Sequence, residues 1–146
     1  MDVITRFRDE YEFLSNFYEV PVTFNGLTYG SSEAAFQAHK STDPAVHEMF
    51  AALRPHQSKE EGRKIQLRKD WEDVKVSIME EILRAKFTQN PDLMEKLLAT
   101  KQALIVEGNN WKDTFWGFDV NLGYGQNMLG QLLMKIRAEY QGKLKK

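Results

Sequence analysis

The segment from Ser31 to Lys40 constrains the fold more than any other part of the chain, because as a helix it has almost no polar surface. Helical winding at about 100° per residue places Glu33, Gln37 and Lys40 in one narrow stripe. The remaining surface is apolar, with His39 at its edge, and is formed by Ala34, Ala35, Phe36 and Ala38. A surface helix has a wide polar face. We therefore expect this helix to be buried, with its polar stripe forming one wall of a pocket.

A purely structural interpretation of the stripe fits the sequence equally well. Ser31 and Ser32 can cap the helix, and Glu33 is then a first-turn acid that interacts with the helix dipole, worth about 0.3–1 kcal/mol. Glu33 and Lys40 would then form a solvated ion pair. The stripe alone does not decide between the two interpretations.

The composition is that of one globular domain. The chain has 146 residues, of which 42% are hydrophobic and 28% charged. We expect a single domain over residues 1–141 and a short basic tail over 142–146. Twenty basic and twenty-one acidic residues give a net charge of −1. This balance argues against extended nucleic-acid binding as the main activity, although a nucleotide or one modified base is compatible with it.

Cysteine is absent, which excludes disulfides, thiolate nucleophiles and zinc–cysteine sites. The three histidines have no zinc-binding spacing, and we predict neither a metal nor a cofactor. We predict no signal peptide, and the sequence has no apolar run of about 18 residues. We therefore expect a cytoplasmic protein without membrane association, and no motif identifies a protein partner.

The sequence pattern predicts an α+β fold that is rich in helix and has a small N-terminal β-hairpin. The first thirty residues have extended character, with strands over Val3–Phe7 and Val20–Phe24 and a hairpin turn at Asn25-Gly26. Later helices are bounded by prolines and glycines. They are expected from 31 to before Pro44, over 45–53, in a short stretch that Gly62 interrupts, and over 71–87, 91–100 and 127–140, with a strand over 103–106.

The helix over 71–87 carries two lysines within its apolar arc. Lys75 and Lys86 project between Ile82 and Met79. An unpaired buried ammonium group is costly, so for either lysine alone we expect the long side chain to reach the surface. Two lysines on one line also fit a second pocket wall.

Residues 107–124 have little helical or strand character but are rich in aromatic side chains, namely Trp111, Phe115, Trp116, Phe118 and Tyr124. Such a loop suits stacking on a planar base and equally suits packing on the core. Two acids in it, Glu107 and Asp113, could join Glu33 in supplying the carboxylates that glycoside cleavage requires.

The last predicted helix begins with Gly125-Gln126-Asn127-Met128-Leu129-Gly130. Exposed backbone N–H groups at such a helix start can bind a phosphate. The simpler interpretation is an ordinary helix cap with close helix packing. The segment is not the dinucleotide-binding fingerprint, because Asn127 occupies the position of the middle glycine.

Several of these residues occur together in the order of a known family. The chain resembles the NADAR family, named for its association with NAD and ADP-ribose, over residues 7–138. The residues that carry the resemblance are Phe13-Leu14-Ser15-Asn16-Phe17, Tyr29 to Lys40, Trp71 with Lys75, Lys86-Phe87, Leu98 with Thr100, Glu107, Asp113 with Trp116-Gly117, and Gly125-x-Asn127-x-Leu129-Gly130-x-x-Leu133-Met134-x-x-Arg137.

The resemblance implies an N-glycosidase that hydrolyses the C1′–N bond of a ribose phosphate. Two substrate classes follow from it: ribosylamino-pyrimidine phosphate intermediates of riboflavin biosynthesis, and ADP-ribosylated guanine in nucleic acid. The alternative is a module that binds ADP-ribose or NAD without catalysis. The near-neutral charge favours a small phosphorylated ribosyl metabolite.

On this basis we expect Glu33, Lys40 and Asp113 to be catalytic. Glu33 is the expected acid/base, and Lys40 acts either as an electrostatic partner or as a nucleophile that forms a Schiff base with the opened sugar. We expect Lys75, Lys86 and the helix start at Asn127 to bind phosphate, and Trp116 to stack on the base. The full set of expected substrate-binding residues is Asn16, Gln37, Lys75, Lys86, Glu107, Trp116, Gly125 and Asn127.

Overall fold

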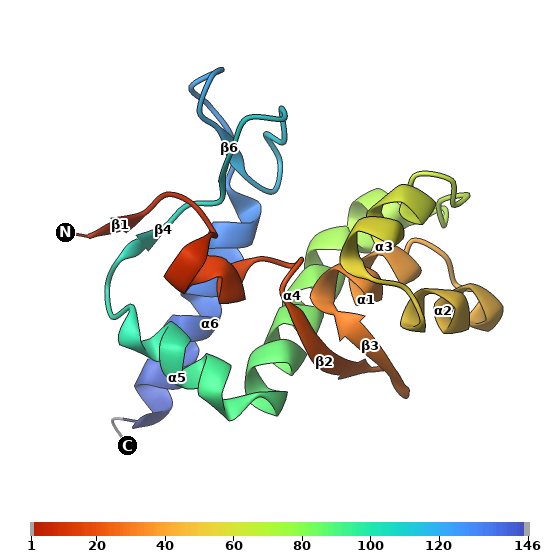
Figure 1. Ribbon diagram of the computed structural model, residues 1–146, viewed down its shortest axis with the longest axis horizontal. Helices are drawn as coiled ribbons and strands as arrows, with labels where there is room; N and C mark the ends of the chain where they lie inside the picture. The colour runs from red at the N-terminus through yellow and green to blue at the C-terminus, as the bar shows by residue number, and fades with distance from the viewer. Residues whose placement is uncertain (1, 145–146) are drawn as a thin grey trace. The chain divides into compact units, whose positions relative to one another are not determined.

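The computed structural model describes residues 2–144 (Figure 1). The chain forms two compact units. The central unit comprises Asn16–Pro91, and the terminal unit combines the residues up to Ser15 with those from Asp92 onward. Helices predominate and the strands are short, which confirms the predicted α+β, helix-rich fold class.

The central unit begins with the predicted hairpin. Strands β2 (Glu19–Phe24) and β3 (Leu27–Ser31) pair antiparallel. Asn25 (φ 51°) and Gly26 (φ 86°) both adopt left-handed conformations. Two such residues match the right-handed twist of the strands that they connect. The hairpin and its turn are therefore confirmed.

Four helices complete the central unit: α1 (Ser32–Ala38), α2 (Pro44–Ala51), α3 (Pro55–Gly62) and α4 (Trp71–Gln89). Pro44 and Pro55 are the first residues of α2 and α3, where a missing N–H breaks no helical hydrogen bond. Gly62 ends α3, so the expectation that it interrupts a helix is wrong.

Helix α1 is the centre of this unit. All seven of its residues are buried, and it packs against α2, α3, α4 and β3. The ring of Phe36 lies 5.1 Å from that of Trp71 on α4, measured between ring centroids. The prediction that this helix is buried is confirmed.

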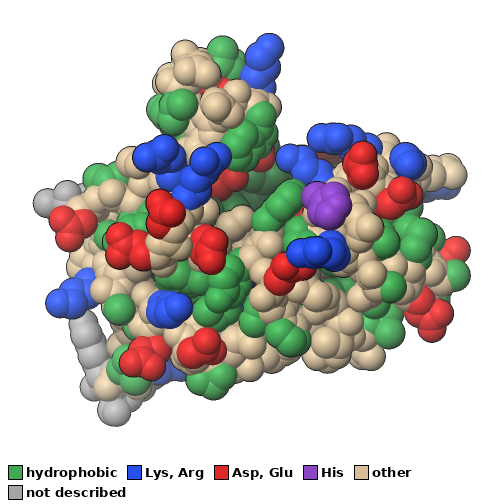
Figure 2. Space-filling model, in the orientation of Figure 1, with side chains coloured by type: hydrophobic (Ala, Val, Ile, Leu, Met, Phe, Trp, Pro, Cys, Tyr) green, Lys and Arg blue, Asp and Glu red, His purple; other side chains and the backbone are tan. Residues whose placement is uncertain are grey.

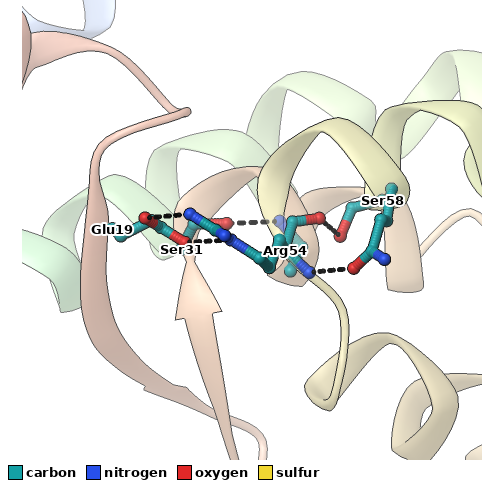
Figure 3. Close-up of polar contacts among 6 residues, drawn as sticks. Glu19, Ser31, Arg54 and Ser58 are labelled. Carbon is teal, nitrogen blue, oxygen red and sulfur yellow. Dashed lines mark hydrogen bonds and ion pairs between the residues drawn. The ribbon is translucent and has the colours of Figure 1, made fainter.

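Helix α3 is fixed to the hairpin at its first turn (Figure 3). The Arg54 guanidinium donates to both carboxylate oxygens of Glu19, each at 3.0 Å. The Arg54 N–H donates to Gln57 Oε1 at 2.9 Å, and the Arg54 carbonyl accepts from Ser58 Oγ at 3.0 Å. These bonds connect the start of α3 to β2 and occupy backbone groups that a helix start leaves unpaired.

The terminal unit combines helices with two pairs of short strands. Its elements are the 3₁₀ helix η1 (Asp9–Leu14), α5 (Pro91–Ala99), α6 (Met128–Leu144), and the parallel pairs β1 (Val3–Ile4) with β4 (Leu104–Ile105) and β5 (Gly108–Asn109) with β6 (Phe118–Asp119). Its core includes Phe13, Leu97, Ile105, Leu133 and Ile136.

The structure differs from the sequence-based expectations in η1 and at the C-terminal end of α6. The extended stretch expected over the first thirty residues is wrong for 9–14, which form η1, because three acids favour its first turn while Phe13 and Leu14 pack into the core. Of the expected tail, residues 142–144 belong to α6, and Lys145 and Lys146 lie outside the described residues.

Ser31 caps α1, since its Oγ accepts a hydrogen bond from the N–H of Ala34 at 3.1 Å. We predict that Ser31→Ala lowers the free energy of unfolding by about 1 kcal/mol, because that N–H loses its acceptor. Urea denaturation measures the change. Ser77→Ala, at an exposed position within α4, is the control and should have no destabilising effect. Equal stability of the two variants would contradict the capping role.

Candidate active site

The predicted site residues are divided between the two units. Glu33, Lys40, Asn16, Gln37, Lys75 and Lys86 belong to the central unit, and Glu107, Asp113, Trp116, Gly125 and Asn127 belong to the terminal unit.

Glu33 and Gln37 form a polar pair on α1, and Lys40 lies close to them after the helix. The Gln37 Nε2 donates to Glu33 Oε1 at 3.0 Å, and the two residues are only 7% and 8% exposed. Helix α1 ends at Ala38, so Lys40 lies in the turn that follows it rather than on the helix. Its Nζ donates to the carbonyl of Gly62 at 3.4 Å. The carboxylate of the stripe is therefore enclosed and oriented, not solvated.

Opposing effects act on the ammonium group of Lys40. Burial lowers its pKa, the neighbouring Glu33 carboxylate raises it, and the charge of Arg63 adds to the lowering. The net direction is downward. A lysine in this environment is more easily deprotonated than one on the surface, while Glu33 still favours its charged form.

Asn16 holds the start of α1 in place. Its carbonyl accepts from the Glu33 N–H at 3.1 Å, and its Oδ1 accepts from Ser32 Oγ at 2.8 Å. Its Nδ2 lies 3.6 Å from Met79 Sδ. These bonds give Asn16 a structural role beside Glu33. The next residue, Phe17, is 41% exposed, with the Lys59 Nζ 5.8 Å from its ring centroid.

The two lysines of α4 have different environments. Lys75 forms an ion pair with Glu72, and its side chain keeps 19% of its surface exposed. Lys86 has no exposed surface; its Nζ lies 5.3 Å from the ring centroid of Phe87 and 5.9 Å from that of Tyr18. Burial lowers the pKa of Lys86 to about 7. The surface position expected for a single lysine holds for Lys75 and is wrong for Lys86, which has no exposed surface for a phosphate to contact.

The central unit also carries a basic surface that was not predicted from the sequence. Lys and Arg side chains gather over α3 and the segment that follows it (Figure 2). Residues 54–69 contain six lysines and arginines and only two glutamates. We call this region the α3 basic surface; it consists of Arg54, Lys59, Arg63, Lys64, Arg68 and Lys69. The density of charge was visible in the sequence, but its place beside α1 was not.

In the terminal unit, the start of α6 does not offer its N–H groups to a ligand. The N–H groups of Asn127, Met128 and Leu129 donate to the carbonyls of Gly117, Phe115 and Trp116 at 2.9–3.0 Å. The Asn127 side chain bridges the Glu107 N–H and the Ile105 carbonyl, each at 2.9 Å. The exposed phosphate-binding N–H groups expected after Gly125 are therefore absent at these three positions, because the aromatic loop occupies them.

Asp113 and Trp116 belong to a loop that polar side chains organise. Asp113 Oδ1 accepts from the Trp116 N–H at 3.0 Å. Buried Asp119 accepts from the N–H groups of Lys112, Asn121 and Leu122 at 2.7–2.8 Å, and these bonds, with that of Leu122 the largest effect, lower its pKa. Trp116 contacts Phe115 edge to face, with 4.8 Å between ring centroids, and is half-buried.

Glu107 lies against Gly117 in the same unit. A Cβ added to Gly117 would lie 1.9 Å from Glu107 Oε2. The absence of a side chain at Gly117 therefore leaves room for the Glu107 carboxylate.

Among residues 2–144, no group of three His, Asp or Glu side chains is arranged to hold a metal ion. Within the same range, no helix combines the length and apolar character needed to span a bilayer.

The buried Lys86 generates a prediction for stability. Its depressed pKa means that the folded state loses the proton above about pH 7, whereas the unfolded chain keeps it until roughly pH 10.4. The free energy of unfolding should therefore rise between these pH values, by at most about 1.4 kcal/mol per pH unit. Lys86→Met should remove this rise in denaturant titrations at pH 7 to 9.5, and Lys75→Met should keep it. An unchanged slope in Lys86→Met would contradict the assignment.

Comparison with known proteins identifies the family. Residues 5–141 match the NADAR domain family. The chain is 40% identical over 134 residues to N-glycosidase YbiA of Escherichia coli K12, covering 90% of this chain and 82% of that protein. It is 39% identical over 136 residues to a riboflavin biosynthesis protein of Vibrio vulnificus, covering 91% of this chain but only 36% of that longer protein.

A solved structure is also similar. The NMR structure of the E. coli protein YbiA matches with a TM-score of 0.89 and 36% sequence identity, and the match covers 99% of this chain and 88% of that one. The family match extends through both units. The chain belongs to the NADAR domain family.

Proposed function

We propose that this protein is an N-glycosidase that hydrolyses the C1′–N bond between a phosphorylated ribose and a base-like leaving group. The observation that carries the proposal is the enclosed Glu33 carboxylate, which Gln37 orients from 3.0 Å and beside which Lys40 supplies a positive charge. The names of the relatives support the same reaction, since one is an N-glycosidase and another a riboflavin biosynthesis protein.

The reaction needs one proton on the leaving nitrogen and one hydroxyl group on C1′. Glu33 in its acid form donates the proton to the nitrogen as the C1′–N bond breaks. The resulting carboxylate then accepts a proton from the water whose oxygen bonds to C1′, which restores the acid. A positioned carboxyl group that serves both steps returns to its starting state after each turnover.

The ammonium group of Lys40 stabilises the negative charge of Glu33 or of the substrate phosphate electrostatically. The α3 basic surface adds positive charge on the same unit, and such a surface raises the local concentration of an anionic substrate. Phe17 is exposed and follows Asn16, which hydrogen-bonds to the start of α1. Its ring can stack on the planar leaving group. These features fit a small phosphorylated ribosyl metabolite.

The substrate assay tests the proposal. Purified protein is incubated separately with a ribosylamino-pyrimidine 5′-phosphate and with DNA that carries ADP-ribosylated guanine, and mass spectrometry identifies the released sugar. We expect ribose 5-phosphate from the first substrate. Release of ADP-ribose from the DNA alone would move the substrate to the second class. Binding of ADP-ribose or NAD without turnover of either substrate would make the protein a non-catalytic module and overturn the proposal.

Glu33→Gln tests the acid/base role. The amide keeps the size of the side chain and still presents an oxygen to Gln37 Nε2, so the variant should fold normally. It cannot exchange a proton, and we expect kcat to fall at least ~100-fold. Glu48→Gln, at an exposed position of α2, is the matched control. Near-wild-type turnover in Glu33→Gln would remove Glu33 from the mechanism.

Lys40 variants separate its two possible roles. If the lysine acts through its charge, Lys40→Arg should retain a substantial part of the rate that Lys40→Ala loses, and borohydride added during turnover should trap nothing. If the amine forms an imine with the opened sugar, both variants should be equally inactive, because a guanidinium is not a nucleophile. Peptide mapping would then find a reduced sugar adduct at Lys40. We expect the first result: burial lowers the pKa of Lys40, but the neighbouring Glu33 carboxylate opposes this lowering and interacts directly with the ammonium group.

A further inference from the structure

The last residue of α3, Gly62, lies directly against the side chain of Gln37. A Cβ added to Gly62 would lie 2.0 Å from Gln37 Oε1, 2.6 Å from its Cδ and 3.2 Å from its Cβ. Both residues are buried. The amide of Gln37 therefore occupies the space that any other residue at position 62 would need.

Only one end of the Gln37 amide is hydrogen-bonded. Nε2 donates to Glu33 Oε1 at 3.0 Å, whereas Oε1, on the side of Gly62, has no hydrogen-bond partner within residues 2–144. A buried acceptor without a partner is unfavourable. The bond to Glu33 is therefore the polar interaction that holds the amide in this orientation.

Helix α3 is connected to its neighbours at both ends, and these connections fix the position of Gly62 relative to α1. Its start is bound to β2 through Arg54 and Glu19. At its end, the Gly62 carbonyl accepts from Lys40 Nζ at 3.4 Å. A side chain at position 62 must therefore displace Gln37 or strain these connections.

We infer that Gly62 is a positioning residue of the active site: its missing side chain lets the Gln37 amide lie between α3 and α1 and hold the Glu33 carboxylate. The inference rests on the proposed role of Glu33 as the acid/base. Gly62 itself touches no substrate in this scheme, and it acts only through Gln37.

Gly62→Ala tests the inference through kcat. The new methyl group displaces the Gln37 amide, Glu33 loses its orienting bond, and we expect kcat to fall about 10- to 100-fold, the scale of a misplaced catalytic group, with a smaller change in KM. The control is Gly30→Ala in the same unit, because a Cβ there meets no atom within 4 Å and kcat should not change.

A double-mutant cycle separates positioning from a general loss of structure. Gln37→Ala removes Oε1 and Cδ, the two atoms that an added Cβ would overlap most. In that background, adding Gly62→Ala should change kcat by less than about 2-fold. If Gly62→Ala lowers kcat by the same factor in both backgrounds, the inference is wrong. If Gly62→Ala alone does not fold, recovery of folding in the double variant supports the inference and continued failure overturns it.

A measurement that does not depend on activity keeps this test distinct from that of the proposed function. The side-chain NH₂ signals of Gln37 in a ¹H–¹⁵N spectrum are assigned by their absence in Gln37→Ala. They should shift and exchange faster with water in Gly62→Ala but not in Gly30→Ala. Unchanged Gln37 signals in Gly62→Ala would refute the positioning role even in a protein that hydrolyses its substrate. Shifted signals in a protein without hydrolase activity would refute the proposed function alone.

Discussion

The structure of the central unit depends on the complete burial of α1. A helix without a solvated face must satisfy its polar groups internally, because an unpaired buried polar group is costly. Glu33 and Gln37 meet part of this constraint by bonding to each other, while Gln37 Oε1 has no hydrogen-bond partner within residues 2–144. Asn16 bonds to the backbone at the start of the helix. Helices α2, α3 and α4 pack against α1 and contribute to its burial. The arrangement that completes the fold also fixes a carboxylate in one orientation, which an acid/base catalyst requires.

The aromatic loop of the terminal unit is organised by polar groups more than by its aromatic side chains. Asp119 accepts three backbone N–H groups, and Asn127 bridges the Glu107 N–H and the Ile105 carbonyl. Because the carbonyls of residues 115–117 accept the first N–H groups of α6, the loop and the helix are one hydrogen-bonded structure. The segment Gly125–Gly130, whose sequence suggested an anion-binding site, therefore forms hydrogen bonds that stabilise the fold.

The sequence predicted those structural features that depend on residues close together in the chain. The hairpin turn at Asn25-Gly26 was predictable because it needs two residues that tolerate positive φ. The burial of α1 was predictable from its composition and helical period. The 3₁₀ helix over 9–14 was not, because the local pattern predicted extended structure there and does not show that Phe13 and Leu14 pack into the core.

The sequence by itself determined the fold class, the hairpin, the burial of α1 with Glu33 and Gln37 in its polar stripe and, through the order of its motifs, the family. Only the tertiary structure decided which of two similar lysines is buried, because Lys75 and Lys86 occupy the same helical arc and differ in what packs over them. It alone revealed Gly62 against Gln37, because these residues are distant in the chain and a contact across two helices leaves no periodic trace in the sequence. Periodicity records which face of a helix is buried, and it does not record which atoms lie opposite.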